Sequence, residues 1–397
     1  MRVLTLLALS LWFAQLMAAD DAALRAKAEE LAKKFIIVDT HVDLPYRLEN
    51  NPEEVNVRTA RGEMDYVRAK AGGLDAPFMS IYTPASLQKP GEAKAHANRL
   101  IDMVEGIAAK WPDKFAIATS PEEVRQQFAK GLVSLPLGLE NGSPIGDDLA
   151  NLKVFYDRGI RYITLTHSRN NLICDSSYDS VRKWNGLSPF GREVVKEMNR
   201  LGIMVDISHV SDDAFYQVME IAKAPAIASH SSCRAFTPGF ERNMDDAMIK
   251  TLAKNGGVIM INFGSSFISD TYRKGGDEIR TKVRSFMEEH QLPRNDPKVR
   301  ALIDRLRKEL KFADVTDVVD HIDHVVKLVG VDYVGFGSDY DGVGDSLPTG
   351  LKDVSQYPNL IYHLLKAGYS EGDIEKMCYG NIFRVWDAVN DYAAVQP

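Results

Sequence analysis

The chain of 397 residues is poor in cysteine: it has three, Cys174, Cys233 and Cys378. Three cysteines can form at most one disulfide, and their wide spacing lacks the CxxC pairs of a structural zinc site. Neither a disulfide framework nor a cysteine-bound metal therefore holds this fold together. We expect the three thiols to be buried or idle.

The sequence also lacks long apolar runs and an excess of basic residues. Beyond the N-terminal leader no segment offers about 18 uninterrupted apolar residues, which excludes a spanning helix there. The final residues, DYAAVQP, lack the hydrophobic end of a GPI signal, so we predict no stable membrane anchor. The formal net charge of -7 disfavours binding to nucleic acid or to an anionic membrane surface.

The leader itself predicts export. Residues 1–19 combine a basic Arg2, an apolar run that ends at Met17 and two small alanines, which is the pattern of a cleaved secretory signal. We therefore expect cleavage near Asp20 and a mature protein in the periplasm or outside the cell. The remaining residues, 20–397, are predicted to form a single domain.

Glycine-rich phosphate-binding motifs are absent, because neither GxGxxG nor GxxxxGK[ST] occurs. The chain instead alternates short apolar runs with amphipathic helical patterns. The eight runs that predict strands are Phe35–Val42, Pro77–Tyr82, Leu132–Leu139, Ile160–Thr166, Gly202–Ser208, Pro225–Ser229, Gly257–Phe263 and Tyr333–Ser338. The predicted helices are Ala93–Lys110, Pro121–Lys130, Asp147–Arg158, Phe190–Leu201, Asp212–Lys223 and Asp245–Asn255. Eight such units favour an α/β fold of the (β/α)8 TIM barrel type over an open doubly wound sheet.

Two segments depart from this alternation. Residues Ser265–Asp314 are charged and helical in pattern, and they predict an insertion between the seventh and eighth strands. Residues Glu371–Val389 predict a C-terminal helical segment that packs against the outside of the barrel.

Six of the predicted strands end in residues of types that commonly bind metal ions. These residues are His41, Glu140, His167, His209, His230 and Asp339. In a (β/α)8 barrel all strand ends meet at one face, so these side chains converge, and buried carboxylates beside several histidines are costly without a cation. Imidazole and carboxylate ligands suit zinc, with manganese, iron or cobalt as alternatives. Two ions that share a carboxylate would use this many ligands.

Three other patterns are weaker candidates. His321 and His324 lie within a predicted helix, where we expect a solvated face rather than a ligand pair. The segment SDYDGVGD resembles a calcium loop, but Gly350 stands where the loop requires glutamate. Neither HExxH nor GxSxG occurs, and the serines of SHSS, residues 229–232, are not expected to act as nucleophiles.

The chain resembles the membrane dipeptidase (renal dipeptidase) family of zinc peptidases, peptidase family M19, a branch of the amidohydrolase-like barrels. The motifs that carry the resemblance are HVD, GLENG, LTHSRNN, VDISHVS, APAIASHSS, ERN and GSDYDG, in the order of the family and over Val38–Gly342. The resemblance implies a homodimeric enzyme with two zinc ions per chain that hydrolyses dipeptides, including some with a C-terminal D-residue.

The resemblance also implies a role for each site residue. His41 and Asp43 would bind one zinc ion, His209 and His230 the other, and Glu140 would bridge them. His167 would contact the substrate carbonyl oxygen, and Asp339 would orient the bridging water and pass its proton to the leaving amine. Arg242, in ERN, would hold the terminal carboxylate of the substrate, with Arg234 as the alternative.

Two other functions remain open from the sequence. A different barrel amidohydrolase, such as an N-acyl-amino-acid deacylase, a lactonase or a β-lactam hydrolase, would use the same metals on another bond. A periplasmic binding protein without catalysis is the second alternative, although pure binding requires neither Asp339 nor His167.

Overall fold

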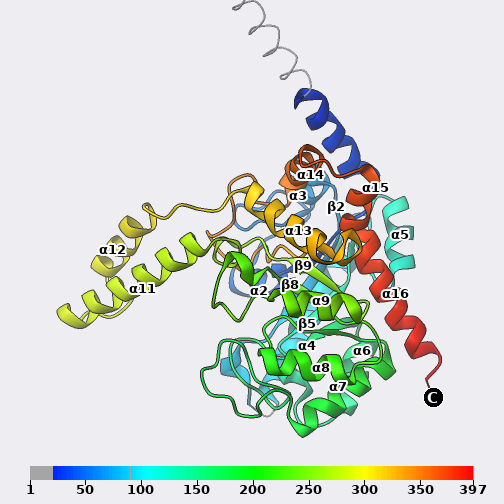
Figure 1. The fold of residues 1–397 in the computed structure, drawn as a ribbon, viewed down its shortest axis with the longest axis horizontal. Coiled ribbons are helices and arrows are strands. Elements are labelled where there is room, and N and C mark those ends of the chain that lie inside the picture. The colour runs from blue at the N-terminus through cyan, green and yellow to red at the C-terminus, as the bar shows by residue number, and fades with distance from the viewer. Residues whose placement is uncertain (1–20, 90, 397) are drawn as a thin grey trace, which may run out of the picture.

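The structure is a computed structural model that describes residues 21–89 and 91–396 (Figure 1). The predicted secretory signal, residues 1–19, lies outside the described residues. The described chain begins with a helix over residues 21–34, which leads into the first strand.

Eight strands form one parallel sheet that closes almost completely into a barrel. They are β1 (Ile37–Val42), β2 (Leu74–Tyr82), β5 (Leu137–Glu140), β6 (Ile160–Thr164), β7 (Met204–Asp206), β8 (Ile227–Ser231), β9 (Val258–Ile261) and β10 (Val334–Phe336). Each strand pairs with the next one in this order. A parallel bridge between Val42 and Tyr340 brings the first strand to the segment after the last. The predicted TIM-type barrel is confirmed.

Helices cover the outside of this barrel. They are α2 (Leu44–Asn50), α3 (Tyr66–Gly72), α4 (Glu92–Lys110), α5 (Pro121–Ala129), α6 (Ala150–Asp157), α7 (Pro189–Leu201), α8 (Asp212–Ile221), α9 (Asp246–Lys254), α13 (Val315–Val329) and α14 (Tyr357–Lys366). Their starts follow from the sequence, because the side chains of Ser120, Ser188, Ser211 and Asp245 accept hydrogen bonds from the first turns of α5, α7, α8 and α9. The strands are buried because these helices cover them.

One strand prediction is wrong. The run Leu132–Leu139 is not a single strand but contains two, β4 (Val133–Leu135) and β5. Strand β4 pairs with β3 (Phe115–Ile117) in a separate two-stranded sheet, and only β5 belongs to the barrel. Pro136 separates them, because its ring cannot donate to a sheet ladder while its carbonyl oxygen accepts from the backbone of Met79 in β2.

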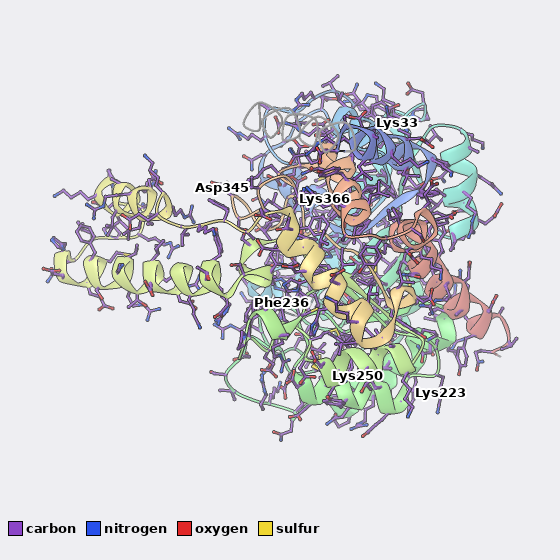
Figure 2. All side chains as sticks on the ribbon, turned by 45° about the horizontal axis from the view of Figure 1, so that its top comes forward. Lys33, Lys223, Phe236, Lys250, Asp345 and Lys366 are labelled. Carbon is purple, nitrogen blue, oxygen red and sulfur yellow. The ribbon has the colours of Figure 1, made fainter. Side chains whose placement is uncertain are left out.

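The predicted insertion is present as a helical arm. It consists of α10 (Ser265–Ile268), α11 (Asp270–His290) and α12 (Pro297–Arg307). Both figures show α11 and α12 side by side and extending away from the barrel (Figures 1 and 2). A small apolar cluster that includes Val283, Val299 and Leu306 joins the two helices.

The C-terminal segment is helical, but it is not one regular helix. It consists of α15 (Glu371–Glu375), one π-helical stretch, η6 (Lys376–Gly380), and α16 (Asn381–Ala394). Trp386 of α16 is fully buried, and its ring centroid lies 5.2 Å from that of Phe78 in β2. The same apolar cluster contains Ile227 and Val258, which begin their strands, so α16 covers the end of the barrel at which the strands start.

The three cysteines are buried and free, as expected. Burial raises the pKa of each thiol, which makes all three unreactive. Within the described part of the chain, no helix combines the length and the apolar character that crossing a membrane requires.

Candidate metal centre

The candidate metal ligands come together where the barrel strands end. His41 lies in β1 and His230 in β8, Glu140 is the last residue of β5, and His209 follows β7 by three residues. His209 and Asp339 adopt positive φ angles of 70° and 67°. Non-glycine residues seldom adopt this left-handed conformation, and such strain is typical of functional sites.

Glu140 is the centre of the cluster. One of its oxygens, Oε1, lies 3.2 Å from Nε2 of His209, 3.3 Å from Nε2 of His230 and 3.5 Å from Nε2 of His167. The other oxygen, Oε2, lies 3.5 Å from Nε2 of His41. That same His41 nitrogen lies 3.4 Å from Asp43. The two carboxylate oxygens therefore face different sets of side chains.

These separations fit metal coordination. Two ligand atoms that each lie about 2.0–2.1 Å from a tetrahedral zinc ion are about 3.4 Å apart. Three groups have their ligand atoms within 4.8 Å of one another, namely His41 with Glu140 and His230, Glu140 with His167 and His209, and His41 with Asp43 and Asp339. The donor set contains only imidazole and carboxylate, which suits a catalytic zinc or a related transition metal.

The hydrogen-bonding partner of His41 orients its ring toward this cluster. The hydroxyl of Tyr162 donates to the carbonyl oxygen of Thr40 at 3.0 Å, and it lies 3.0 Å from Nδ1 of His41. A hydroxyl has one proton, so it accepts from Nδ1. The buried Nε2 atom of His41 has no hydrogen-bond partner among the described residues, and it is free to bind a cation.

His230 is held in the same way through a serine. The hydroxyl of Ser229 donates to Asp206 at 2.6 Å and accepts from Nδ1 of His230 at 2.7 Å. Its Nε2 atom lies 2.8 Å from Nε2 of His209. Two imidazole nitrogens that face each other this closely either share a proton or converge on a common cation.

The electrostatics of the cluster favour positive charge beside Glu140. Burial raises the pKa of Glu140, but His41 and His167 outweigh it and hold that pKa well below the ordinary value. Burial lowers the pKa of His209 and of His230 well below normal, so both imidazoles are neutral and can donate lone pairs. Burial also lowers the pKa of His167.

An open pocket of about 710 Å³ lies over the cluster. Its polar wall includes Asp43, Glu140, His167 and Asp339, and Tyr46 lines it as well. Burial raises the pKa of Asp339 to about 7.

Asn262 holds the side chain of Asp339 through a hydrogen bond. The amide of Asn262 donates to Asp339 at 2.8 Å. Such a bond fixes the orientation of the carboxylate at the edge of the pocket.

The two arginine candidates have different surroundings. Arg242 is buried beside the cluster, where it donates to the carbonyl oxygen of His230 and to Ser231, both at 2.7 Å. Arg234 instead binds Asp212 through both terminal nitrogens, at 2.6 and 2.7 Å. Arg234 is therefore already paired, whereas Nε of Arg242 has no partner among the described residues.

The expectation of a solvated face at His321 is wrong. His321 in α13 is fully buried; its Nδ1 atom accepts from the backbone of Cys233 at 3.0 Å, and Nε2 lies 3.2 Å from the carbonyl oxygen of Ile268. His324 lies 2.7 Å from Asp246. Neither histidine belongs to the group of candidate metal ligands.

Asp341, the third position of the calcium-like segment, has partners of its own. The carboxylate of Asp341 accepts from Arg47 at 3.0 Å and from the backbone of Glu63 at 2.6 Å. It belongs to none of the candidate metal groups among the described residues.

The sequence did not reveal several supporting residues, among them Tyr162, Asp206, Ser229 and Asn262. A signal exists for Asp206: a charged residue stands inside the apolar run MVDIS, and Asp39 in IIVDT repeats this pattern. Both aspartates are fully buried, and Asp39 accepts from Ser338 and Tyr357. An aspartate inside a buried strand requires such donors.

Comparisons with known proteins agree with this geometry. The family model described as "Membrane dipeptidase (Peptidase family M19)" matches residues 25–397. The chain is 30% identical over 381 residues to an uncharacterized dipeptidase of Schizosaccharomyces pombe, which covers 92% of this chain and 83% of the relative. It is similar in structure to the probable dipeptidase PvdM of Pseudomonas aeruginosa, with a TM-score of 0.83, 28% identity and coverage of 94% and 100% of the two chains.

A second solved structure contains a ligand. It is a metallopeptidase of Rhodobacter sphaeroides with a bound phosphinate mimic of the dipeptide L-Ala-D-Ala. The TM-score is 0.74 at 25% identity, and the match covers 89% of this chain and 99% of the other.

Proposed function

The chain belongs to the membrane dipeptidase family, peptidase family M19, and is a metallo-dipeptidase; on this premise we propose that it hydrolyses dipeptides that have a free C-terminal carboxylate, with two zinc ions bridged by Glu140. The observation that carries this proposal is the division of Glu140 between two sets of ligands. His41, which is itself next to Asp43, adjoins one of its oxygens, and His209 and His230 adjoin the other. When bound, two such ions acidify a water molecule between them and polarise the carbonyl of the substrate.

His167 is assigned to the substrate rather than to a metal ion. Its side chain is 21% exposed to the pocket, whereas His41, His209 and His230 are at most 6% exposed. A side chain at the pocket surface can donate a hydrogen bond to the carbonyl oxygen as negative charge develops there. His167 therefore stabilises the oxyanion.

Asp339 is assigned to proton transfer. It lines the pocket, belongs to the same group as His41 and Asp43, and is held by Asn262. A carboxylate in that place can accept a proton from the attacking water and deliver it to the leaving amine.

Arg242 is assigned to the terminal carboxylate of the substrate. Its two bonds to His230 and Ser231 use two of five N–H groups and fix the plane of the guanidinium beside the pocket. The N–H groups of a planar guanidinium can donate two parallel hydrogen bonds to the two oxygens of a carboxylate. A requirement for this group close to the scissile bond limits the enzyme to dipeptides, including those with a C-terminal D-residue.

The test is a hydrolysis assay on a panel of dipeptides, N-acyl amino acids and lactones, with and without chelator. Turnover of dipeptides that is lost with chelator and restored by zinc supports the proposal. Turnover of only the acyl amino acids or lactones identifies a different barrel amidohydrolase, and metal binding without turnover identifies a binding protein. Blocking the C-terminal carboxylate as an amide should abolish hydrolysis.

We also propose that the mature protein is exported and forms homodimers. The leader over residues 1–19 supports export, and the resemblance to the family supports the dimer. N-terminal sequencing of protein from the periplasm or medium, together with light scattering, measures both.

A further inference from the structure

The wall of the pocket contains one permanently charged side chain that the proposed mechanism does not use. Among the described residues that line this pocket, Arg169 is the one lysine or arginine. It lies on the loop that follows β6, two residues beyond His167. Its side chain is 65% exposed.

The backbone of Arg169 is fixed while its guanidinium is nearly free. Its carbonyl oxygen accepts from the hydroxyl of Thr166 at 2.6 Å, and the side chain of the next residue, Asn170, donates to the carbonyl of Val181 at 2.5 Å. Within the described part of the chain, the guanidinium has one ion-pair contact, at 3.5 Å with Asp179, whose other oxygen accepts from the backbone of Asn170. Four of its five N–H groups remain available for an anion.

A series of contacts connects the loop of Arg169 with Arg242, the group assigned to the substrate carboxylate. The residue beside Asp179 is Tyr178, which also lines the pocket and has its ring 5.9 Å from His209 and 6.1 Å from Phe240. Phe240 in turn contacts Phe267.

Arg242 completes this chain of contacts, because its guanidinium lies 5.5 Å from the centre of the Phe267 ring. Arg182 further joins the two segments, since it donates to the carbonyl of Ser176 on the loop and pairs with Glu241.

We propose that Arg169 makes this pocket selective for dipeptides whose C-terminal residue has an acidic side chain. The inference rests on the proposed dipeptidase function and adds a substrate class to it. Arg242 takes the α-carboxylate, and Arg169 takes the second carboxylate from the rim. The planar guanidinium exchanges its weak contact with Asp179 for a bidentate pair of hydrogen bonds with the side-chain carboxylate of the substrate.

The experiment compares isosteric pairs that differ in charge. The wild-type protein is assayed for kcat/KM on Ala-Glu against Ala-Gln, and on Glu-Ala against Gln-Ala. We expect a preference of about three- to tenfold for Ala-Glu, the size of one partly screened ion pair, and none for Glu-Ala. The preference should shrink as salt is raised.

Arg169→Met should abolish this preference while hydrolysis of Ala-Gln is kept. Lys183→Gln is the matched control, because Lys183 lies on the same loop, stacks on Trp184 and does not line the pocket. It removes the same charge and should keep the preference.

Failure of the inference is distinguishable from failure of the proposed function. Absence of any dipeptide hydrolysis contradicts the function itself. Hydrolysis without discrimination between Ala-Glu and Ala-Gln overturns only the role of Arg169. The role of Arg169 is also overturned if Arg169→Met lowers kcat/KM equally for Ala-Glu and Ala-Gln, or if the preference appears with Glu-Ala instead.

Discussion

The hydroxyl of Ser229 lies 2.6 Å from a carboxylate oxygen of Asp206, and this contact determines that Nδ1 of His230 carries the proton, which leaves Nε2 with a lone pair. Asp206 accepts four bonds, which include the backbone amides of Ser208 and Ser229 and the hydroxyl of Thr164. The proton of Ser229 is therefore committed to Asp206, and Nδ1 of His230 must donate to the serine.

We predict that Ser229→Ala weakens binding of zinc by about 10- to 100-fold, because the ring of His230 loses the partner that fixes it. The measurement is competition with a chromophoric chelator on the purified protein. Ser229→Thr preserves the hydroxyl and should restore most of the affinity. Equal affinity of the wild type and Ser229→Ala would show that the serine has only a packing role.

The second prediction concerns Asp339→Asn. The amide keeps the shape of the side chain but cannot accept a proton, so kcat should fall by about 10²- to 10⁴-fold. The metal content and KM should change little, because His41, Asp43 and Glu140 remain. Turnover and elemental analysis of the same sample check both statements. Loss of metal together with turnover would instead identify Asp339 as a ligand.

The sequence predicted the barrel because the signal is local and repeated. Each buried parallel strand is a short apolar run, and several crossover helices begin at a capping side chain, as at Ser188 and Ser211. The division of Leu132–Leu139 has one local signal, Pro136, but the change of strand partner has none, since both halves of the run are apolar.

The convergence of the candidate metal ligands was predictable from their positions, because the ends of parallel strands meet at one face of the barrel. Their supports were not, since Tyr162 and Ser229 act through hydrogen bonds between strands that are distant in the sequence. The placement of the Arg169 side chain could not be predicted either. Its sequence position beside His167 says nothing about the direction of its guanidinium, which depends on the loop around Asp179.

The third prediction uses the lack of space at Gly342. A Cβ atom there would lie 2.2 Å from Oδ2 of Asp43 and 2.5 Å from Oδ1 of Asp339. Gly342→Ala must therefore displace one of these carboxylates, and we expect kcat/KM to fall at least about 10²-fold. Gly106→Ala is the control, because no atom lies within 4 Å of its added Cβ. Full activity of Gly342→Ala would contradict the tight packing described here.

The fourth prediction separates the two arginines. Arg242→Lys keeps the charge but not the planar pair of donors, so KM for dipeptides should rise about tenfold or more while kcat changes less. Arg234→Lys should leave KM unchanged, because Arg234 is bound to Asp212. Steady-state kinetics on one dipeptide measure both variants. A larger effect at Arg234 would reverse the assignment.

The last prediction is a pH dependence of stability that originates far from the metal cluster. Asp75 in β2 is buried, and burial raises its pKa from 3.8 to about 7, against the opposing effects of Lys70 and of the bond from the backbone of Ile37. Between pH 4 and pH 7 the folded state thus holds a proton that the unfolded state has lost. Stability falls as the pH rises through this window, and above it Asp75 adds no further pH dependence.

Asp75→Asn removes this titration and should flatten the curve. The contribution of one proton is a slope of at most about 1.4 kcal/mol per pH unit. Urea unfolding at pH 5, 6, 7 and 8 measures the free energy of unfolding for the wild type and for the variant. The difference between them should change steadily up to pH 7 and then stay constant. A difference that is constant over the whole range would mean that Asp75 is ionised in the folded protein at pH 5, because the proton is then absent from both states.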